Sequence, residues 1–310
     1  MLSGLGRVAG VFFASLLGAC AAQSRAEGRA KLEAPLTRTL VITATPAEFS
    51  AVEALVEGGV ERRSGPSRVI EGRISGVDVV LLLSGVSIVY ASMTTQWALD
   101  TYSVDKIVVS GVAAGLSPDL NVGDVTVARR WGKYDEMKYF RSPQAAQGHD
   151  GIPSSSAGFP PFGFMRPRGL LDIEGGRSRR FWFEADSELI RTLRVAPRDS
   201  PLPSCLEGQC VQEAPRIRVV EAGVSGSVFM DNQPFAEYLR ATFDASVLEM
   251  ETAAIAAVAH VNGVPFIAFR AISDLAASVI PAKTQYQSFH GLAAANAART
   301  AAAFIKDASE

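Results

Sequence analysis

Two runs of consecutive apolar residues constrain the fold more than any other feature of this sequence. They are residues 79–83 (VVLLL) and residues 107–109 (IVV), and neither alternates between apolar and polar positions. A strand with one face in water alternates, whereas a strand covered by helices on both faces is apolar throughout. Helical stretches follow such runs along the chain, an order typical of α/β folds. We therefore expect a three-layer α/β/α sandwich around a central mixed, mostly parallel sheet.

The same alternation continues toward the C-terminus, with one interruption. Between Gly132 and Ala185 it fails, and clusters of Pro, Gly and Ser occur at residues 151–156 and 158–163. So long an irregular stretch is uncommon in a compact domain and is often functional. We therefore expect one domain, residues 37–310, with an irregular insertion at about residues 132–185. The expected strands are residues 40–42, 77–83, 106–110, 217–222, 246–248 and 265–270, and the expected helices start near 46 and 87 or span 186–194, 231–241, 250–262 and 288–306.

The first twenty residues have the pattern of a targeting segment. A short stretch with one positive charge, Arg7, precedes an apolar run at residues 8–17 and then Gly18, Ala19 and Cys20. A run this short does not span a hydrocarbon core of about 30 Å as a helix, so cleavage is expected rather than a permanent anchor. The small residues before Cys20 resemble the bacterial lipoprotein box, in which the cysteine is lipidated.

We accordingly predict a lipoprotein-type signal peptide at residues 1–19, lipidation of Cys20 and a flexible tether at residues 20–36, which are small, polar and charged. The protein would then be exported and held by a lipid anchor on the periplasmic face of a membrane. Ordinary cleavage nearby, giving a secreted or soluble periplasmic protein, is the alternative.

The remaining cysteines, Cys205 and Cys210, form an even pair separated by a short segment that contains Gly208. Export would place them in an oxidising compartment, where a local disulfide is expected. Two unpaired thiols in a surface loop are the alternative. No metal site is expected, because the histidines form no ligand spacing with these cysteines.

The charge balance excludes partners that bind through electrostatic attraction alone. The chain has 30 Lys and Arg against 32 Asp and Glu, a formal net charge of −2, and no clustered basic patch. Nucleic acids and anionic membranes usually require a basic face. We therefore expect no nucleic-acid partner, and membrane contact only through the lipid.

Acidic residues follow several expected strands, where α/β proteins bind their ligands. Glu48 follows the first strand, Glu249 and Glu251 follow residues 246–248, and Ser273 and Asp274 follow residues 265–270. We expect these groups to converge on one pocket. Capping of helix starts is the alternative for each acidic residue taken alone. Glu251 and Asp274 lie among apolar neighbours, so each is expected to be partly buried and hydrogen-bonded.

Two longer segments make a family resemblance specific. Residues 248–254 (LEMETAA) are similar to a ribose-binding segment, and residues 266–274 (FIAFRAISD) to a catalytic strand and loop, of the nucleoside phosphorylase superfamily of purine/uridine phosphorylase type. The chain is most similar to its methylthioadenosine/S-adenosylhomocysteine nucleosidases and their secreted branch, which includes plant bark-storage proteins. Further segments in the family's order are residues 84–86, 110–116, 122–125 and 225–230.

The resemblance implies a role for each candidate residue. Asp274, oriented by Ser273, would protonate N7 of the purine, and Glu48 would activate a water. Glu251, beside Glu249, would bind the ribose hydroxyls, with Met250 packed under the sugar. The remaining candidates are Phe229, which would stack on the base, Met230, whose backbone would read the base edge, and Gly85 and Val112, whose backbone would hold an anion or a water. For Phe229 and Met230, simple core packing is the alternative.

Hydrolysis is favoured over phosphorolysis, because family phosphorylases carry an arginine in the loop that here spans residues 109–115 and contains none. The expected function is hydrolysis of the N-glycosidic bond of a purine nucleoside, with no cofactor. A phosphorylase and a non-catalytic nucleoside-binding or storage protein are the alternatives. The resemblance further implies a homodimer.

Overall fold

The computed structural model describes residues 37–62, 65–147, 158–171, 173, 178–193, 201–276, 278 and 280–309. The predicted signal peptide, Cys20 and the tether lie outside these residues. The fold below is that of the unit Leu36–Glu310. No helix within the described residues is long and apolar enough to cross a membrane.

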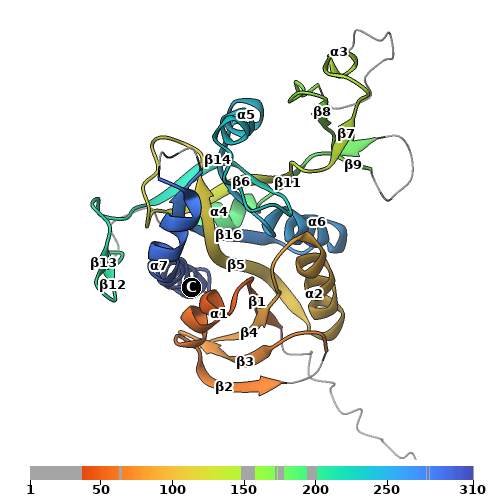
Figure 1. Ribbon diagram of the computed structural model, residues 1–310. Coiled ribbons are helices and arrows are strands. Elements are labelled where there is room, and N and C mark those ends of the chain that lie inside the picture. Colours follow the sequence, from red (N-terminus) through yellow and green to blue (C-terminus); the bar gives the residue numbers. More distant parts are fainter. Residues whose placement is uncertain are drawn as a thin grey trace, which may run out of the picture. The chain divides into compact units, whose positions relative to one another are not determined.

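The described strands build one large mixed sheet with additional short two-stranded pairs (Figure 1). At its centre, β1 (Arg38–Thr43) lies parallel between β4 (Val77–Leu83) and β5 (Val104–Gly115). β16 (Phe266–Leu275) runs parallel to β5 along its whole length and also pairs antiparallel with β6. The expected α/β fold with a central mixed sheet is confirmed. The other strands of this sheet are β2 (Glu57–Arg62), β3 (Val69–Ile74), β6 (Val125–Lys133), β11 (Trp182–Glu184), β14 (Ile217–Ser225) and β15 (Ala245–Glu249).

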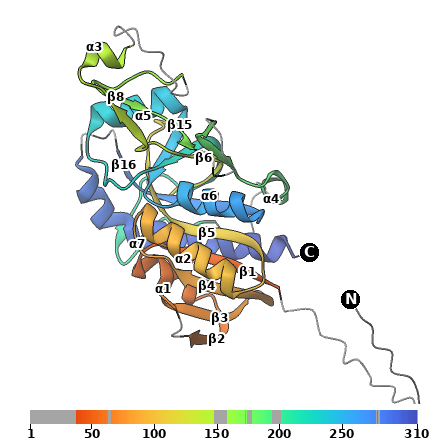
Figure 2. The same ribbon diagram turned by 90° about the vertical axis from the view of Figure 1, so that its right-hand side faces the viewer.

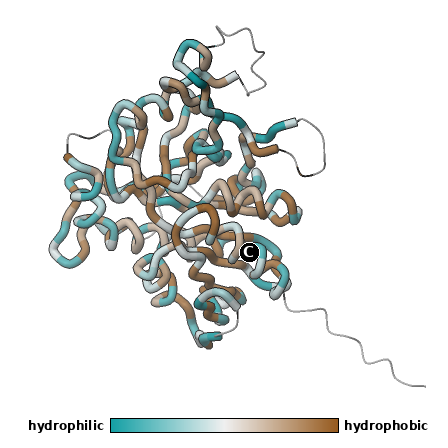
Figure 3. The backbone as a smooth tube through the Cα atoms, turned by 45° about the vertical axis from the view of Figure 1, so that its right-hand side comes forward, coloured by the Kyte–Doolittle hydropathy of each residue, from teal (hydrophilic) through white to brown (hydrophobic). Residues whose placement is uncertain are grey.

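Helices cover the two faces of the sheet (Figures 1 and 2). α1 (Pro46–Glu53) packs against α7 (Ala282–Asp307), and α2 (Ile88–Thr101) packs against α6 (Thr252–Asn262). The remaining helices are α3 (Pro143–Ala146), α4 (Ser187–Thr192) and α5 (Gln233–Phe243). The apolar runs of β1, β4, β5 and β16 are buried between these layers, and Figure 3 shows the central strands in brown.

Of the expected insertion at about residues 132–185, the described part contains short strands. β7 (Met137–Tyr139) pairs with β8 (Met165–Pro167), and β9 (Leu170–Leu171) pairs with β10 (Arg179–Arg180), both antiparallel. β11 then returns the chain to the edge of the main sheet by pairing with β6.

The ends of two elements differ from expectation in ways that matter for the pocket. The strand expected to end at Arg270 continues to Leu275, because β5 offers a partner along its full length, so Ser273 and Asp274 lie within β16. Its register against β5 shifts between Ile272 and Asp274. Such a bulge re-aims the side chains beside it. The last helix begins at Ala282 rather than at Ser288. At its first residue, the Ala282 N–H donates a hydrogen bond to the Asp231 carboxylate at 3.3 Å.

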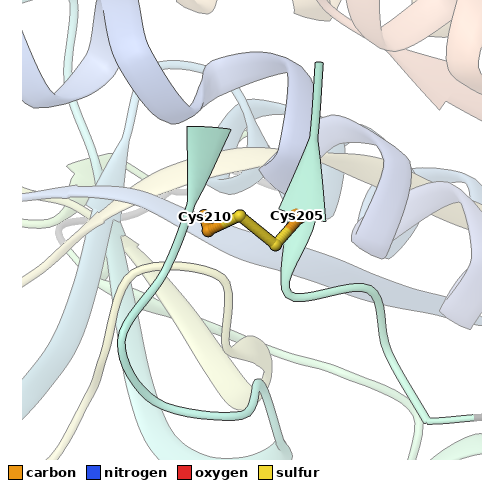
Figure 4. The surroundings of a disulfide bond; sticks show 2 residues. All are labelled: Cys205 and Cys210. Carbon is orange, nitrogen blue, oxygen red and sulfur yellow. A yellow bond between two sulfur atoms is a disulfide. The ribbon is translucent and has the colours of Figure 1, made fainter. Parts of the chain in front are cut away.

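Cys205 and Cys210 form a disulfide that closes the hairpin of β12 (Cys205–Leu206) and β13 (Gln209–Cys210) (Figure 4). The hairpin packs against α7. The Asn296 side chain on α7 donates to the carbonyl oxygens of Gly123 at 3.0 Å and of Pro203 at 3.2 Å. The segment that leads to the disulfide is therefore fixed to the last helix and to the core.

We expect opposite effects from alanine at two glycines. A Cβ on Gly223 in β14 would lie 2.4 Å from Cζ3 of Trp131, a fully buried ring with no room to move, whereas a Cβ on Gly291 in α7 would meet Leu206 Cδ2 at an ordinary 3.4 Å. Gly223→Ala should lower the free energy of unfolding by about 2–3 kcal/mol through overpacking. Gly291→Ala should raise it by about 0.5–1 kcal/mol, because alanine is the better helix former. Urea unfolding measures both, and equal stability of the two variants would contradict this packing.

Candidate active site

A pocket opens at the carboxyl ends of β1, β5, β14, β15 and β16. Much of its wall is apolar and includes Val86, Val112 and Met250. The polar side chains in the wall are the acidic groups singled out from the sequence together with Ser273, Thr45 and Tyr286, the last of which the sequence did not suggest. The structure thus brings together Glu48, Glu249, Glu251 and Asp274 from three separate segments.

Glu48 occupies the first turn of α1, where Thr45 and Glu48 form a capping box. Its Oε2 accepts hydrogen bonds from the N–H groups of Ala44 at 2.9 Å and Thr45 at 2.8 Å, and its Oε1 accepts one from the Val112 N–H at 2.8 Å. The capping alternative therefore holds for this residue, yet the side chain also lines the pocket. A carboxylate accepts about four hydrogen bonds, so Glu48 can bind one further donor from the pocket.

Arg270 is a further residue of the site that the sequence analysis missed. Its guanidinium, 1 % exposed, donates to Thr252 Oγ1 at 2.9 Å, to Glu249 Oε2, to Glu251 Oε2 at 3.4 Å and to the Val112 carbonyl at 3.3 Å. Glu48 Oε1 lies 4.0 Å from its Nη1. Burial opposes the charge of Arg270, but the surrounding carboxylates outweigh burial and raise its pKa. The signal was a single cation within an otherwise apolar strand, which requires buried partners.

Glu249 holds this cluster together. Its oxygens accept hydrogen bonds from Ser225 Oγ, from Arg270, from the Glu251 N–H at 3.0 Å and from the Thr252 N–H and hydroxyl, both at 2.9 Å. The sequence predicts Glu249 as a substrate-binding residue. In the structure these bonds commit both oxygens, so the carboxylate chiefly positions Arg270 and the start of α6.

Glu251 precedes α6 but turns away from the first turn of its helix. Its Oε1 accepts a hydrogen bond from the Ser87 N–H at 2.8 Å, and its carboxyl lines the pocket. Burial and the nearby Glu249 carboxylate raise its pKa to about 8, despite the opposing effects of Arg270 and Ser87. Ser87 has a φ of 88°, a conformation that is costly for a residue with a side chain. The hydrogen bond to Glu251 helps to hold that conformation.

Asp274 lies at the bulge of β16 and is 3 % exposed. The Ser273 hydroxyl donates to its Oδ1 at 2.7 Å. Burial raises the pKa of Asp274 to about 6, against the lowering effect of Ser273, and Asp231 raises it further. This carboxyl can therefore carry a proton at mildly acidic pH while remaining accessible from the pocket.

The apolar candidates divide between the pocket and the core. Phe229 and Met230 both line the pocket; Phe229 is 48 % exposed, whereas the Met230 side chain is buried in a core cluster around α5. Met250 is half-buried and lines the pocket. For Met230 the core-packing alternative therefore applies alongside contact with the pocket.

Two positions expected to hold an anion or a water are arranged differently. The Val112 N–H is used by Glu48, and its carbonyl accepts from Arg270. The residues that line the pocket include Val86 but not Gly85. The Val112 backbone thus supports Glu48 and Arg270 instead of presenting a free donor to a ligand.

Gly111 in β5 makes the approach of Arg270 to Glu48 possible. A Cβ at this position would lie 2.3 Å from Arg270 Nη1 and 2.7 Å from Glu48 Oε1. Glycine within a strand often marks such a close approach. Gly111 was therefore a second signal of a buried polar cluster.

The described residues contain no group of His, Cys, Asp and Glu that could hold a metal ion. The pocket instead combines a carboxylate held by backbone N–H groups, Glu48, with a carboxyl of raised pKa, Asp274. Such a pair provides a base and an acid at one site, which is the requirement for cleaving a glycosidic bond.

Comparison with known proteins places the chain among enzymes with this chemistry. Residues 38–308 match the family model described as "Phosphorylase superfamily". A 5′-methylthioadenosine/S-adenosylhomocysteine nucleosidase of Tolumonas auensis is 30% identical over 76% of this chain and 84% of its own length. The same enzyme of Chromohalobacter salexigens is 25% identical over 87% of this chain and 97% of its own length.

A solved structure agrees with the sequence relatives. The nucleosidase of Neisseria meningitidis in complex with methylthio-immucillin-A superposes with a TM-score of 0.66 at 26% identity and covers 87% of this chain and 99% of that chain. The resemblance predicted from the sequence is thereby confirmed. The chain belongs to the phosphorylase superfamily.

Proposed function

We propose that the protein is a nucleosidase that hydrolyses the N-glycosidic bond of a purine nucleoside and releases the free base and the ribose moiety. The observation that carries this proposal is the convergence of Glu48, Glu251 and Asp274 on one pocket, with Asp274 of raised pKa and Glu48 held by backbone donors. The curated relatives are named as nucleosidases of methylthioadenosine and S-adenosylhomocysteine, so nucleosides with an adenine base are the first candidates.

In this mechanism Asp274 is the general acid. As the bond between the sugar and the base breaks, the purine gains electrons, and protonation at N7 stabilises the leaving group. Because its pKa is raised to about 6, part of the Asp274 population still carries this proton near neutrality. Ser273, which donates to Oδ1, orients the carboxyl of Asp274 in the pocket wall.

Glu48 is the general base, and it acts on the water that attacks the sugar. A water bound to its free acceptor position attacks the anomeric carbon of the ribose and passes a proton to the carboxylate. Arg270 Nη1 lies 4.0 Å from Glu48 Oε1 and helps to fix the position of the Glu48 side chain. Glu251, with a pKa of about 8, can donate to one ribose hydroxyl and accept from the other at neutral pH.

Electrostatics favours water over phosphate as the nucleophile. Arg270, which might otherwise attract an anion, is already bound to Glu249 and Glu251 and lies beside Glu48. A phosphate dianion would enter a site rich in carboxylates, where repulsion in a poorly screened environment is costly. The storage alternative is less favoured, because the acid, the base and the ribose-binding carboxyl are all present.

Incubation of the protein with methylthioadenosine, S-adenosylhomocysteine, adenosine and inosine should release free base from at least one of them. Because water is the nucleophile, the rate should be the same with and without phosphate, and the sugar product should carry no phosphate. Chromatography of base and sugar measures both. Release that requires phosphate would establish a phosphorylase, and binding without release would establish the storage alternative.

Asp274→Asn should separate activity from stability. The variant should lose about 10²–10⁴-fold in kcat, the usual contribution of a general acid. In the unmodified protein kcat/KM should fall as pH rises above about 6, because Asp274 then loses its proton.

The same carboxyl should affect stability. The folded-state pKa of Asp274 lies above the ordinary 3.8, so the contribution of Asp274 to the free energy of unfolding is lost as pH rises through about 6. Asp274→Asn should therefore be more stable than the unmodified protein at pH 8, by on the order of 1 kcal/mol.

The matched control for this variant is Asp244→Asn, the same change at an exposed residue. Asp244 has a φ of 52°, a conformation that asparagine tolerates equally well. This control should keep both kcat and the pH profile. An Asp274→Asn variant with full activity would exclude the proposed acid.

We also propose that the mature protein is a lipid-anchored homodimer on the exported side of a membrane. The N-terminal pattern that ends at Cys20 supports the anchor. The dimer is supported by an exposed apolar stripe, Val86, Val89, Tyr90 and Met93, that runs from the pocket rim along α2. Apolar side chains gathered on one helix face often mark a protein contact.

Cells that produce the full chain should incorporate labelled palmitate into it, and Cys20→Ser should abolish that label. The same chain produced without residues 1–36 should sediment with the mass of two chains. A labelled Cys20→Ser protein would contradict the anchor, and a species with the mass of one chain at micromolar concentration would contradict the dimer.

A further inference from the structure

Tyr286 stands in the pocket wall in the second turn of α7, and neither the sequence resemblance nor the proposed mechanism gives it a role. Its ring meets Phe229 edge-on at a centroid distance of 5.9 Å and His290 at 4.6 Å. Both rings restrict the motion of Tyr286, because they lie against it from two different segments. The phenol is therefore held in one place without the help of its hydroxyl group.

The Tyr286 hydroxyl is uncommitted. Among the residues that the structure describes, none forms a hydrogen bond with it, whereas the Ser273 hydroxyl is used by Asp274 and the Thr45 oxygen by the Glu48 N–H. Burial raises the pKa of Tyr286 to about 12, and Glu48, Asp274 and Glu251 add to that effect. The hydroxyl thus lies within electrostatic range of all three reacting carboxyls and stays protonated, able to donate and to accept.

The reacting groups leave one part of the substrate without a polar partner. Asp274 is assigned to N7 of the base, and the Met230 backbone in the pocket wall is expected to bind the edge of the base. Glu48 is assigned to the water at the anomeric carbon, and Glu251 to the 2′- and 3′-hydroxyls. The ring oxygen becomes electron-poor in the transition state, so a hydrogen-bond donor directed at it would oppose the reaction. The substituent at the 5′ carbon is the polar position that remains.

We propose that Tyr286 is a specificity-determining residue whose hydroxyl binds a 5′-hydroxyl group, so that the protein prefers nucleosides with a free 5′-hydroxyl over their 5′-thioether analogues. This inference rests on the proposed nucleosidase function and names its substrate class. A thioether sulfur is a weak acceptor and no donor, and it would leave the Tyr286 hydroxyl unpaired in a largely apolar wall. A site built to bind a hydroxyl discriminates against analogues that lack it.

The test removes the hydroxyl from each partner in turn. Adenosine and 5′-deoxyadenosine differ by the 5′-hydroxyl alone, and Tyr286→Phe removes only the phenolic oxygen, which has no partner among the described residues. In the unmodified protein kcat/KM should be about tenfold higher for adenosine than for 5′-deoxyadenosine, the value of one neutral hydrogen bond. Tyr286→Phe should lose about tenfold on adenosine and nothing on 5′-deoxyadenosine or methylthioadenosine, because the two deletions remove the same interaction.

Tyr139→Phe, the same change at a tyrosine that is 66 % exposed, is the control and should leave all three rates unchanged. An equal loss on adenosine and 5′-deoxyadenosine in Tyr286→Phe would overturn the inference and make Tyr286 a general contributor to the reaction. No loss on either would overturn it as well. If the unmodified protein releases base from methylthioadenosine but discriminates against adenosine, this inference fails while the proposed function stands. If it releases no base from any nucleoside, the proposed function itself fails.

Discussion

A guanidinium buried in the centre of a sheet must be surrounded by acceptors, and the site around Arg270 is organised by this requirement. Arginine keeps its charge at every pH the protein meets, so Arg270, 1 % exposed, is tolerated only where carboxylates and carbonyls surround it. Those partners come from the start of α1, from β5, from the end of β15 and from the start of α6. The last two of these are adjacent in the sequence, so one side chain fixes the relative position of three segments that are far apart along the chain. Gly111 completes the arrangement, because any side chain there would occupy the space between Arg270 and Glu48.

The same cluster determines the protonation states that the chemistry needs. One cation cannot fully offset three nearby carboxylates. Burial and the nearby Glu249 carboxylate therefore raise the pKa of Glu251 to about 8. Glu249 receives so many donors that it serves as the counterion of Arg270. Glu48 is held by three backbone N–H groups, which fix the position of its carboxylate. Asp274 lies apart from Arg270 at the bulge of β16, and burial raises its pKa without a cation to offset the effect. The acid and the base thus differ because their surroundings differ.

The fold was predictable because local sequence patterns indicate its strands and helices. Much of the site was not predictable from such patterns. Apolar runs such as residues 79–83 identify buried strands by composition alone, and the structure buries them. Placing Glu48, Glu251 and Asp274 at strand ends required only the order of strands and helices. The bulge at Ser273 and the extension of β16 to Leu275 depend on pairing with β5, which no local pattern encodes. The use of the Val112 N–H by Glu48, rather than by a ligand, likewise depends on a contact across 64 positions of the sequence. Arg270 and Gly111 did carry signals, a cation and a glycine within buried strands, but their meaning becomes clear only when the two strands are seen side by side.

The residues proposed to break the glycosidic bond and those proposed to select the substrate lie on different elements of the fold. The acid and the counterion cluster lie on or directly beside central strands, where the sheet and the charges around Arg270 leave little freedom. Phe229 and Tyr286 lie on a loop and on α7, outside that cluster, and they contact each other. α7 is held by different means: the hydrogen bond from Ala282 to Asp231, the side chain of Asn296 and the disulfide hairpin against its middle. α7 also packs against α1 and β16, and its Gln285 side chain accepts a hydrogen bond from the Leu275 N–H at 2.9 Å, next to Asp274. The helix therefore links the wall of the pocket to the segments that carry the acid and the base. Under the proposal for Tyr286, its phenol sets the preference at the 5′ position, while Asp274 and Glu48 carry out the reaction that the family shares.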